Sequence, residues 1–221
     1  MNPLLSKLQP YPFERLRKLF ADVTPNPAYP AISLGIGEPK HPTPPFIQQA
    51  LADATREGGL AVYPATLGTP QLRASFTGWV RTRYGLTLDQ ATQVLPVNGS
   101  REALFAFAQT VIDPTKDQPC PPQGRPKADS SPLGGSEPHT VGSVGAPVVV
   151  CPNPFYQIYE GAALLAGAEP FYAPSDPARN FAVDWDSVPA DVWARTQLVF
   201  VCSPGNPTGA VMPLTEWEKL F

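Results

Sequence analysis

Apolar and polar positions alternate in two ways along the chain, and the alternation predicts its secondary structure. Apolar runs of strand length occur at 31–34, 92–97, 148–151, 169–173 and 198–202. Apolar residues recur at helical spacing in 13–20, 43–55, 69–84, 100–111, 156–167, 187–194 and from 215 onward. Strands separated by amphipathic helices indicate an α/β fold with a mostly parallel sheet that is buried on both faces.

Hydroxyl residues mark where several of these helices should begin. Thr43 stands before two prolines, Thr69 stands before one, and Ser100 follows a glycine, so each is expected to cap a helix. Thr215 and Glu218 have the spacing of a capping box. The helix that starts at Ser100 is expected to bury a face formed by Leu104, Phe107, Ala108 and Val111.

Proline is frequent in this chain and concentrated in one segment. The sequence has 30 prolines in 221 residues, about 14 % against a usual value of about 5 %. Residues 113–147 hold eight prolines and five glycines with few large apolar side chains, which is typical of low-complexity sequence. Because strand-like sequence resumes at Val148, we interpret 113–147 as a surface insertion, with a linker between two domains as the alternative.

Charge and apolar content exclude several functional classes. Sixteen Lys and Arg against nineteen Asp and Glu give a net charge of −3 without a basic block, so nucleic acid is not an expected partner. The longest apolar runs are far shorter than the roughly 20 residues of a membrane span, and no secretory signal is recognisable. Three cysteines and two histidines without ligand spacing predict a cytoplasmic setting and no metal site.

The end of the 92–97 run offers a candidate anion site. Gly99, Ser100 and Arg101 stand where a strand is expected to turn into a helix. Free N–H groups at a helix N-terminus, a hydroxyl and a guanidinium together suit a phosphate group. The Walker spacing is absent, and an ordinary junction with a serine cap is the alternative.

Two further loops follow predicted strands at the carboxyl edge of the sheet, where open α/β folds bind ligands. Phe155 and Tyr156 come after the 148–151 strand, and they suit stacking on a flat ring, with a core role as the alternative. The segment Ser203–Gly209 holds two prolines and two glycines directly after the 198–202 strand. We expect a rigid loop there that presents the Asn206 amide to a ligand.

The Ser203–Gly209 loop, SPGNPTG, resembles the signature of class I/II aminotransferases, which are pyridoxal-phosphate enzymes of fold type I. Other motifs follow in that family's order: Gly37-Glu38-Pro39, Tyr63-Pro64, Asn98-Gly99-Ser100-Arg101-Glu102 and Pro154-Phe155-Tyr156. The resemblance covers the chain apart from 113–147. A more specific resemblance is to bacterial N-succinyldiaminopimelate aminotransferases. It rests on the segments PYPFERLRKLF, SLGIGEPKHPTP, LPVNGSREALFAF and CPNPFYQIYEGAALLAGAEP.

The resemblance implies pyridoxal 5′-phosphate as the cofactor and gives each matching residue a role. Gly99, Ser100 and Arg101 would hold the cofactor phosphate. Tyr156 would stack on the pyridine ring, and Asn206 would donate a hydrogen bond to the ring's phenolate oxygen.

The resemblance also implies a homodimer and a division into domains. Tyr63 would reach the cofactor phosphate of the partner subunit, and Gly37 would line the substrate carboxylate. Residues 1–45 would form the N-terminal arm and the start of a small domain. Residues 46–221 would form an incomplete cofactor-binding large domain that carries the insertion 113–147.

Some family features have no counterpart in this sequence. The Schiff-base lysine, the aspartate that pairs with the pyridinium and the arginine that binds the substrate carboxylate come after the Asn-Pro-Thr-Gly loop, beyond Phe221. Of the six lysines present, only Lys7 follows a serine, and it lies on the N-terminal arm. We therefore expect an N-terminal fragment without a catalytic residue of its own, which is inactive alone.

The expected function of the parent protein is transamination in lysine and diaminopimelate biosynthesis. It would exchange an amino group between glutamate or 2-oxoglutarate and an N-succinyl-amino-ketopimelate, as a cytoplasmic homodimer without nucleic acid or membrane partners. Another fold-type I reaction, such as C–S lysis or transamination of a different amino acid, is one alternative. A non-catalytic binding domain is another, although the first 30 residues show no helix-turn-helix or basic arm.

Overall fold

The computed structural model describes residues 3–30, 32, 34–115 and 145–221. The chain divides into two compact units, one of Tyr11–Val97 and one of Met1–Pro10 with Asn98–Phe221. The expected insertion at 113–147 lies mostly outside the described residues, which include only its first and last three positions. The domain boundary after residue 45 stays a prediction.

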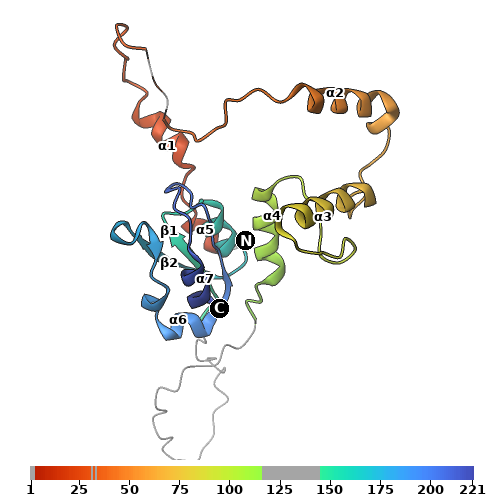
Figure 1. Ribbon diagram of the computed structural model, residues 1–221. Helices are drawn as coiled ribbons and strands as arrows, with labels where there is room; N and C mark the ends of the chain where they lie inside the picture. The colour runs from red at the N-terminus through yellow and green to blue at the C-terminus, as the bar shows by residue number, and fades with distance from the viewer. Residues whose placement is uncertain (1–2, 31, 33, 116–144) are drawn as a thin grey trace, which may run out of the picture. The chain divides into compact units, whose positions relative to one another are not determined.

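The described secondary structure of the Tyr11–Val97 unit is helical. Its elements are α1 (Pro12–Leu19), α2 (Pro45–Ala54), the π-helical turn η2 (Thr55–Gly59) and α3 (Pro70–Tyr84). These elements confirm the three helices predicted for this part of the chain and appear in red to yellow in Figure 1.

The two strands predicted for the same unit do not form among its described residues. Residues 92–97 are turn and coil, so that prediction is wrong. The described sheet is made only of strands from the other unit, so no described strand pairs with this run. Within 31–34, Ile32 and Leu34 belong to no strand, and the other two residues lie outside the described part.

The second unit carries the sheet. Its strands are β1 (Val148–Asn153), β2 (Glu169–Asp176), β3 (Ala182–Val183) and β4 (Thr196–Val199), in the spatial order β3-β2-β1-β4. The central strand β1 runs parallel to both β2 and β4, which confirms the predicted α/β class. The two-residue β3, which the apolar pattern does not predict, pairs antiparallel with β2.

Helices connect and cover these strands. The α-helices are α4 (Ser100–Val111), α5 (Ile158–Leu165), α6 (Ala190–Arg195) and α7 (Leu214–Leu220). Short 3₁₀ turns are η1 (Pro3–Lys7), η3 (Pro177–Arg179) and η4 (Trp185–Ser187). The structure thus confirms the predicted order of strand and helix from 100 to 221, with α5 and α6 shorter than the sequence pattern suggests.

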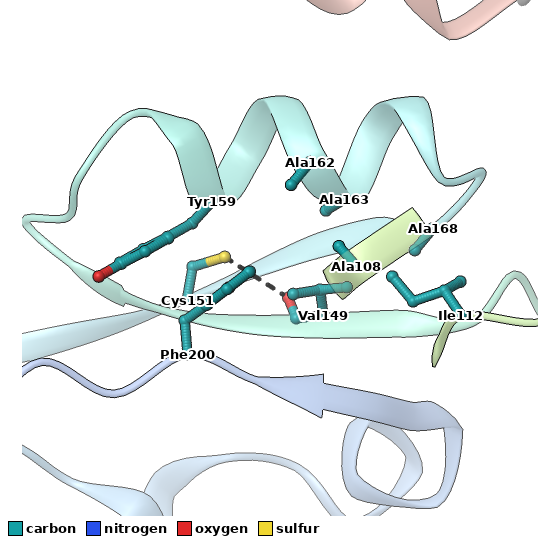
Figure 2. Close-up of a cluster of buried hydrophobic side chains, with 9 residues drawn as sticks. All are labelled: Ala108, Ile112, Val149, Cys151, Tyr159, Ala162, Ala163, Ala168 and Phe200. Atoms are coloured by element: carbon teal, nitrogen blue, oxygen red, sulfur yellow. Dashed lines mark hydrogen bonds between the residues drawn. The ribbon is translucent and has the colours of Figure 1, made fainter. Parts of the chain in front are cut away.

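Strand β1 supplies the centre of the core because its side chains alternate between two apolar faces. Val149 and Cys151 are fully buried on the face covered by α4 and α5. There α5 lies over β1, with Tyr159 and two buried alanines directed at the strand (Figure 2). The alanines, at 162 and 163, let the helix approach the sheet closely.

The opposite face of β1 packs against a different set of elements. Val148 and Val150 are buried there beside Trp185 of η4 and Val192 of α6. Partly buried side chains of the segment after β4, among them Met212 and Leu220, complete this second cluster. A strand that is apolar on both faces is what the continuous run at 148–151 predicts.

Helix α4 buries a somewhat different face from the predicted one. Ala108 is buried and Leu104 packs against the core, as expected. Phe107 and Val111 are exposed at 54 % and 38 %, so their assignment to the core is wrong. The buried stripe follows positions 104, 108 and 112 with Phe105 beside it, because α4 also packs against α5 through a hydrogen bond from Gln109 to the carbonyl of residue 162.

One of the predicted helix caps is confirmed and three are wrong. The Thr69 hydroxyl accepts a hydrogen bond from the Leu72 amide at 3.2 Å and caps α3. At α2, α4 and α7 the cap positions belong to Pro44, Gly99 and Pro213, and no side chain caps them. Thr43 therefore stands one residue before the cap position, Ser100 one residue after it and Thr215 two residues after it.

The described helices contain no segment with the length and hydropathy that crossing a membrane requires.

Candidate functional site

The candidate site lies where β1 and β4 end, at the carboxyl edge of the parallel sheet. The segment after β1 brings Phe155 and Tyr156 to this edge, and the segment after β4 brings Asn206. Phe155 and Asn206 line one cavity, so two loops that are far apart in the sequence meet as predicted. Parallel strands explain this meeting, because their carboxyl ends lie at one edge of the sheet.

The cavity itself is small and mixed in character. It has a volume of about 60 Å³, room for a few water molecules, so a cofactor-sized ligand would lie across its mouth. Its aromatic wall is formed by Phe155, Tyr159, Phe181 and Trp185. Its polar lining includes Ser175, Asn180, Cys202, Asn206, Thr208 and Glu216.

The Ser203–Gly209 loop is closed by hydrogen bonds within itself and with the residues that follow. The Gly209 amide donates to the Gly205 carbonyl at 2.7 Å, and the Gly205 amide donates to the Ala210 carbonyl at 2.8 Å. The Met212 amide donates to the Ser203 hydroxyl at 3.0 Å. Gly209 has a φ of 72°, which favours glycine. These contacts agree with the rigid loop that the sequence predicts.

The candidate anion site at residues 99–101, called the phosphate turn below, forms the N-terminus of α4. Gly99 precedes the helix, and Ser100 and Arg101 are its first two residues, with both side chains exposed. Glu102 folds back toward Gly99, where a Cβ would lie 2.7 Å from a carboxylate oxygen at the movable end of that side chain. The first amides of a twelve-residue helix and an exposed guanidinium thus stand together, which suits an anion.

Arg101 and Tyr156 are brought together by the fold. The guanidinium carbon of Arg101 lies 5.8 Å from the centre of the Tyr156 ring, within cation–π range. Tyr156 meets Tyr159 edge to face with 6.0 Å between ring centres, and Tyr159 stacks on Phe200 at 4.3 Å. The positive charge at α4 therefore lies beside an aromatic ring that the core supports from behind.

Burial alters the acidity of groups beneath this ring. Removal from water raises the pKa of Tyr159 to about 12, with the neighbouring Cys202 adding to the rise. Burial likewise raises the pKa of the Cys151 thiol to about 12, and the charge of Glu160 adds to it. Both groups are neutral at physiological pH, so they support the site as apolar surfaces.

The remaining predicted site residues belong to the Tyr11–Val97 unit. Tyr63 is 99 % exposed, and Gly37 is exposed with open space where a side chain would stand. The roles of Tyr63 and Gly37 stay predictions. Among the described residues no cluster of His, Cys, Asp and Glu could hold a metal ion.

The structure adds residues to the edge of the sheet that the sequence analysis did not single out. Asn180 and Phe181 line the cavity with positive φ angles of 53° and 59°, which side chains rarely adopt. Glu216 lines it from α7 and is ion-paired to Arg179 at 3.0 Å. A faint sequence signal exists for the first pair, because asparagine is among the few residues that tolerate a left-handed conformation.

Comparison with known proteins gives a consistent result. The sequence model of the family described as aminotransferase class I and II matches residues 29–118 and 144–221. The LL-diaminopimelate aminotransferase of Syntrophobacter fumaroxidans is 31 % identical over 98 % of this chain and 48 % of its own length. That of Nitratidesulfovibrio vulgaris is 32 % identical over 98 % of this chain and 47 % of its own. The chain spans about half the length of the curated relatives it matches.

Solved structures show the same fold. An aminotransferase from Neisseria meningitidis is 43 % identical with a TM-score of 0.79, and the match covers 100 % of this chain and 49 % of that one. The N-succinyldiaminopimelate aminotransferase from Mycobacterium tuberculosis is 30 % identical with a TM-score of 0.64, over 83 % of this chain and 40 % of that one. The described sheet and helices therefore form part of a fold-type I domain.

Proposed function

Because the chain belongs to the class I and II aminotransferases, we propose that the carboxyl edge of its sheet binds pyridoxal phosphate, the cofactor of that family. The observation that carries this proposal is the pairing of Arg101 with Tyr156 at the N-terminus of α4. An anion-binding turn and an aromatic face stand side by side there, as a phosphorylated aromatic ring requires.

The residues present fit the cofactor. Gly99, Ser100 and Arg101 would hold the phosphate through helix amides, a hydroxyl and a guanidinium. Tyr156 is half-buried and would cover one face of the ring. Asn206 is exposed at the cavity mouth and would donate its amide to the ring's phenolate oxygen.

The close approach that a cofactor needs is also present in the loop that carries Asn206. A Cβ on Gly205 would lie 2.7 Å from the Thr208 hydroxyl, so the loop is tightly folded at this residue. The Gly205 amide is held by the Ala210 carbonyl, and the neighbouring Asn206 lines the cavity.

When bound, pyridoxal phosphate supplies an aldehyde that takes up an amino group and a ring that withdraws electrons from the adjacent carbon. The residues of this chain contribute binding and orientation. Arg101 would neutralise the phosphate, Tyr156 would hold the ring against its own face, and Asn206 would restrict how the ring turns. Tyr159, itself stacked on Phe200, meets Tyr156 edge to face and supports the position of its ring.

We propose an acyclic diamino acid as the substrate, with glutamate and 2-oxoglutarate as the second pair. The support is that the curated relatives named above are LL-diaminopimelate aminotransferases and that one solved relative is an N-succinyldiaminopimelate aminotransferase. We propose the N-succinylated form, on the motifs shared with that group. Comparing amino transfer from N-succinyl-LL-diaminopimelate and from LL-diaminopimelate decides between the two.

We propose further that the protein acts as a dimer in which Tyr63 contacts the partner's cofactor phosphate and Gly37 lines the substrate carboxylate. The exposed Tyr63 ring is available for such a contact. Sedimentation of the protein with and without Tyr63→Ala tests the contact.

We also propose that a polypeptide of these 221 residues binds the cofactor without transferring amino groups. None of its lysines stands in the Schiff-base turn that the family resemblance implies. Amino transfer is assayed with this polypeptide, with pyridoxal phosphate alone as the background. Transfer by the polypeptide alone would contradict this part of the proposal.

Binding of pyridoxal phosphate to the 221-residue chain, measured by calorimetry, tests the site itself. Arg101→Met is expected to weaken binding about tenfold or more, since it removes a charge-assisted contact to the phosphate. Arg83→Met is a matched control, because Arg83 also lies over a tyrosine ring, that of Tyr84 at 5.6 Å, on helix α3. Equal effects of the two substitutions would overturn the assignment of the phosphate turn.

A further inference from the structure

A network of ion pairs lies beside the proposed site and involves none of the residues assigned to the cofactor. Arg179 is its centre: one guanidinium nitrogen lies 3.0 Å from a carboxylate oxygen of Asp184, and another lies 3.0 Å from a carboxylate oxygen of Glu216. Lys219 extends the network with contacts of 3.2 Å to Asp186 and 3.8 Å to Glu216. The network thus joins three elements, because Arg179 ends η3, Asp186 lies in η4, and Glu216 and Lys219 lie in α7.

The Arg179–Glu216 pair is the most protected part of this network. The Glu216 side chain is 13 % exposed and that of Arg179 is 30 % exposed, so water screens the pair only partly. The second carboxylate oxygen of Glu216 is buried without a hydrogen-bond partner among the described residues. Loss of Arg179 would therefore leave a largely buried charge with Lys219 as its only close counter-charge in the described part of the chain, and α7 would have to move to let water in.

Helix α7 is also the far anchor of the loop that carries Asn206. The loop leaves the sheet after β4 and enters α7 at Leu214, so its two ends are fixed by the sheet and by that helix. Glu216 and Asn206 line the same cavity. Met212 packs into the core cluster that contains Trp185, and its amide is bound to Ser203 at the start of the loop.

The segment after Arg179 lines the same cavity in a strained conformation. Asn180 and Phe181 both have positive φ angles, which are unfavourable for residues with a side chain. The Phe181 amide donates to the Asp176 carbonyl at 2.8 Å, which ties this wall to the end of β2. Backbone strain beside a cavity persists only where surrounding contacts hold it, and the two ion pairs of Arg179 are such contacts.

We propose that Arg179 is a positioning residue for Asn206: by bridging Asp184 and Glu216 it fixes α7 and thereby the loop that presents the Asn206 amide. This inference rests on the proposed function for the identity of the ligand, and on the ion pairs for the mechanical link. A planar guanidinium can hold two carboxylates in fixed directions, whereas a lysine ammonium cannot, so the bridge requires arginine.

The test compares Arg179→Met and Arg179→Lys with a matched control at Arg195. Arg195 is also a partly buried, ion-paired arginine, 3.2 Å from Glu169 and 2.9 Å from the Ala146 carbonyl, and it stands before β4 at the amino end of the strand. Arg195→Met therefore removes a similar ion pair of the same unit without touching α7 or the loop.

The first measurement is amide hydrogen exchange in the chain without cofactor. We expect the Gly209, Ala210 and Met212 amides to exchange at least about tenfold faster in Arg179→Met, since their protection depends on a loop that is fixed at both ends. Arg179→Lys should give nearly the same increase, and Arg195→Met should leave these amides unchanged. Unchanged exchange in Arg179→Met, or an equal increase in Arg195→Met, overturns the proposal.

The second measurement is a double-mutant cycle on the affinity for pyridoxal phosphate. We expect Arg179→Met to weaken binding about fivefold or more in the wild-type background and to have no further effect in the Asn206→Ala background. A merely structural role would weaken binding equally in both backgrounds, and that result would overturn the link to Asn206. If the wild-type chain itself does not bind the cofactor, the proposed function fails, and the exchange experiment still decides whether Arg179 fixes the loop.

Discussion

Cys151 and Tyr159 bring titratable groups into the apolar cluster between α5 and β1. Burial, with a further contribution from Glu160, raises the pKa of the Cys151 thiol from 9.0 to about 12. Burial, followed by the effect of Cys202, raises the pKa of Tyr159 from 10.0 to about 12. The fold therefore stabilises the protonated forms, and the unfolded chain releases these protons at lower pH.

The free energy of unfolding should therefore fall as the pH rises above 9. The stabilisation is complete below pH 9, where both groups are protonated in the folded and in the unfolded chain. Between pH 9 and 12 the unfolded chain loses protons that the folded chain keeps, so the free energy of unfolding falls, by at most about 1.4 kcal/mol per pH unit for each group. Urea unfolding of the wild type and of Cys151→Ala at pH 7 to 11 measures this. The wild type should lose stability more steeply above pH 9, and parallel curves would contradict the prediction.

Side-chain chemistry decided which site residues could be predicted from the sequence. Asn206, Ser100 and Arg101 stand in short motifs where the residue type itself implies a ligand contact. Arg179 and Glu216 carry no such signal, because they are 37 positions apart and ordinary in composition for a turn and a surface helix. Their pairing depends on how α7 returns to the sheet, which no local pattern encodes.

The residues at which helices and strands begin and end could also be predicted only in part. Thr69 caps α3 because the following Pro70 begins the helix at once. Thr43 also precedes proline, yet two prolines follow it and the helix starts at the second, Pro45, so the cap position passes to Pro44. Helix existence was thus predictable from apolar spacing, whereas the cap depended on a shift of one residue. The run at 92–97 has strand character but no neighbour to pair with among the described strands.

Substitution by alanine should change the free energy of unfolding in opposite directions at two glycines, Gly161 inside α5 and Gly167 just after it. Gly161 lies inside the helix with nothing within 4 Å of a new Cβ, so Gly161→Ala should raise the free energy of unfolding by about 0.5–1 kcal/mol. Gly167 ends the helix with a φ of 83°, and its amide donates to the Leu164 carbonyl. Gly167→Ala should lower the free energy by about 1 kcal/mol.

Urea denaturation of the two variants checks this pair, and each serves as the other's control because both add one methyl group near the same helix. The adjacent Ala168 amide donates to the Ala163 carbonyl at 2.9 Å, which identifies the left-handed helix end that requires glycine at 167. Stabilisation by Gly167→Ala would show that the helix ends differently in solution.

For the molecule as a whole, the described ends of the proline-rich segment define how it connects to the sheet. Gln197 at the start of β4 accepts from the Asp113 amide at 2.7 Å and donates to the Asp113 carbonyl at 3.1 Å. Arg195 donates to the Ala146 carbonyl at 2.9 Å, and the Glu169 amide donates to the Pro147 carbonyl at 2.8 Å. Both ends are therefore held at the amino edge of the sheet, opposite to the edge that carries Asn206 and Tyr156.

This placement predicts that residues 116–144 contribute neither to the stability of the sheet unit nor to cofactor binding. Replacing them by a flexible Gly/Ser linker of about eight residues should leave the melting temperature within about 2 °C of the wild type, because the contacts of Gln197 and Arg195 stay intact. The affinity for pyridoxal phosphate should likewise be unchanged. Calorimetric melting and a binding titration measure the two quantities on the same samples. Gln197→Leu in the unshortened chain is the control, because it removes the two hydrogen bonds to Asp113 and keeps residues 116–144. This substitution should lower the melting temperature. A loss of affinity caused by the shortening would contradict the prediction that residues 116–144 do not contribute to cofactor binding.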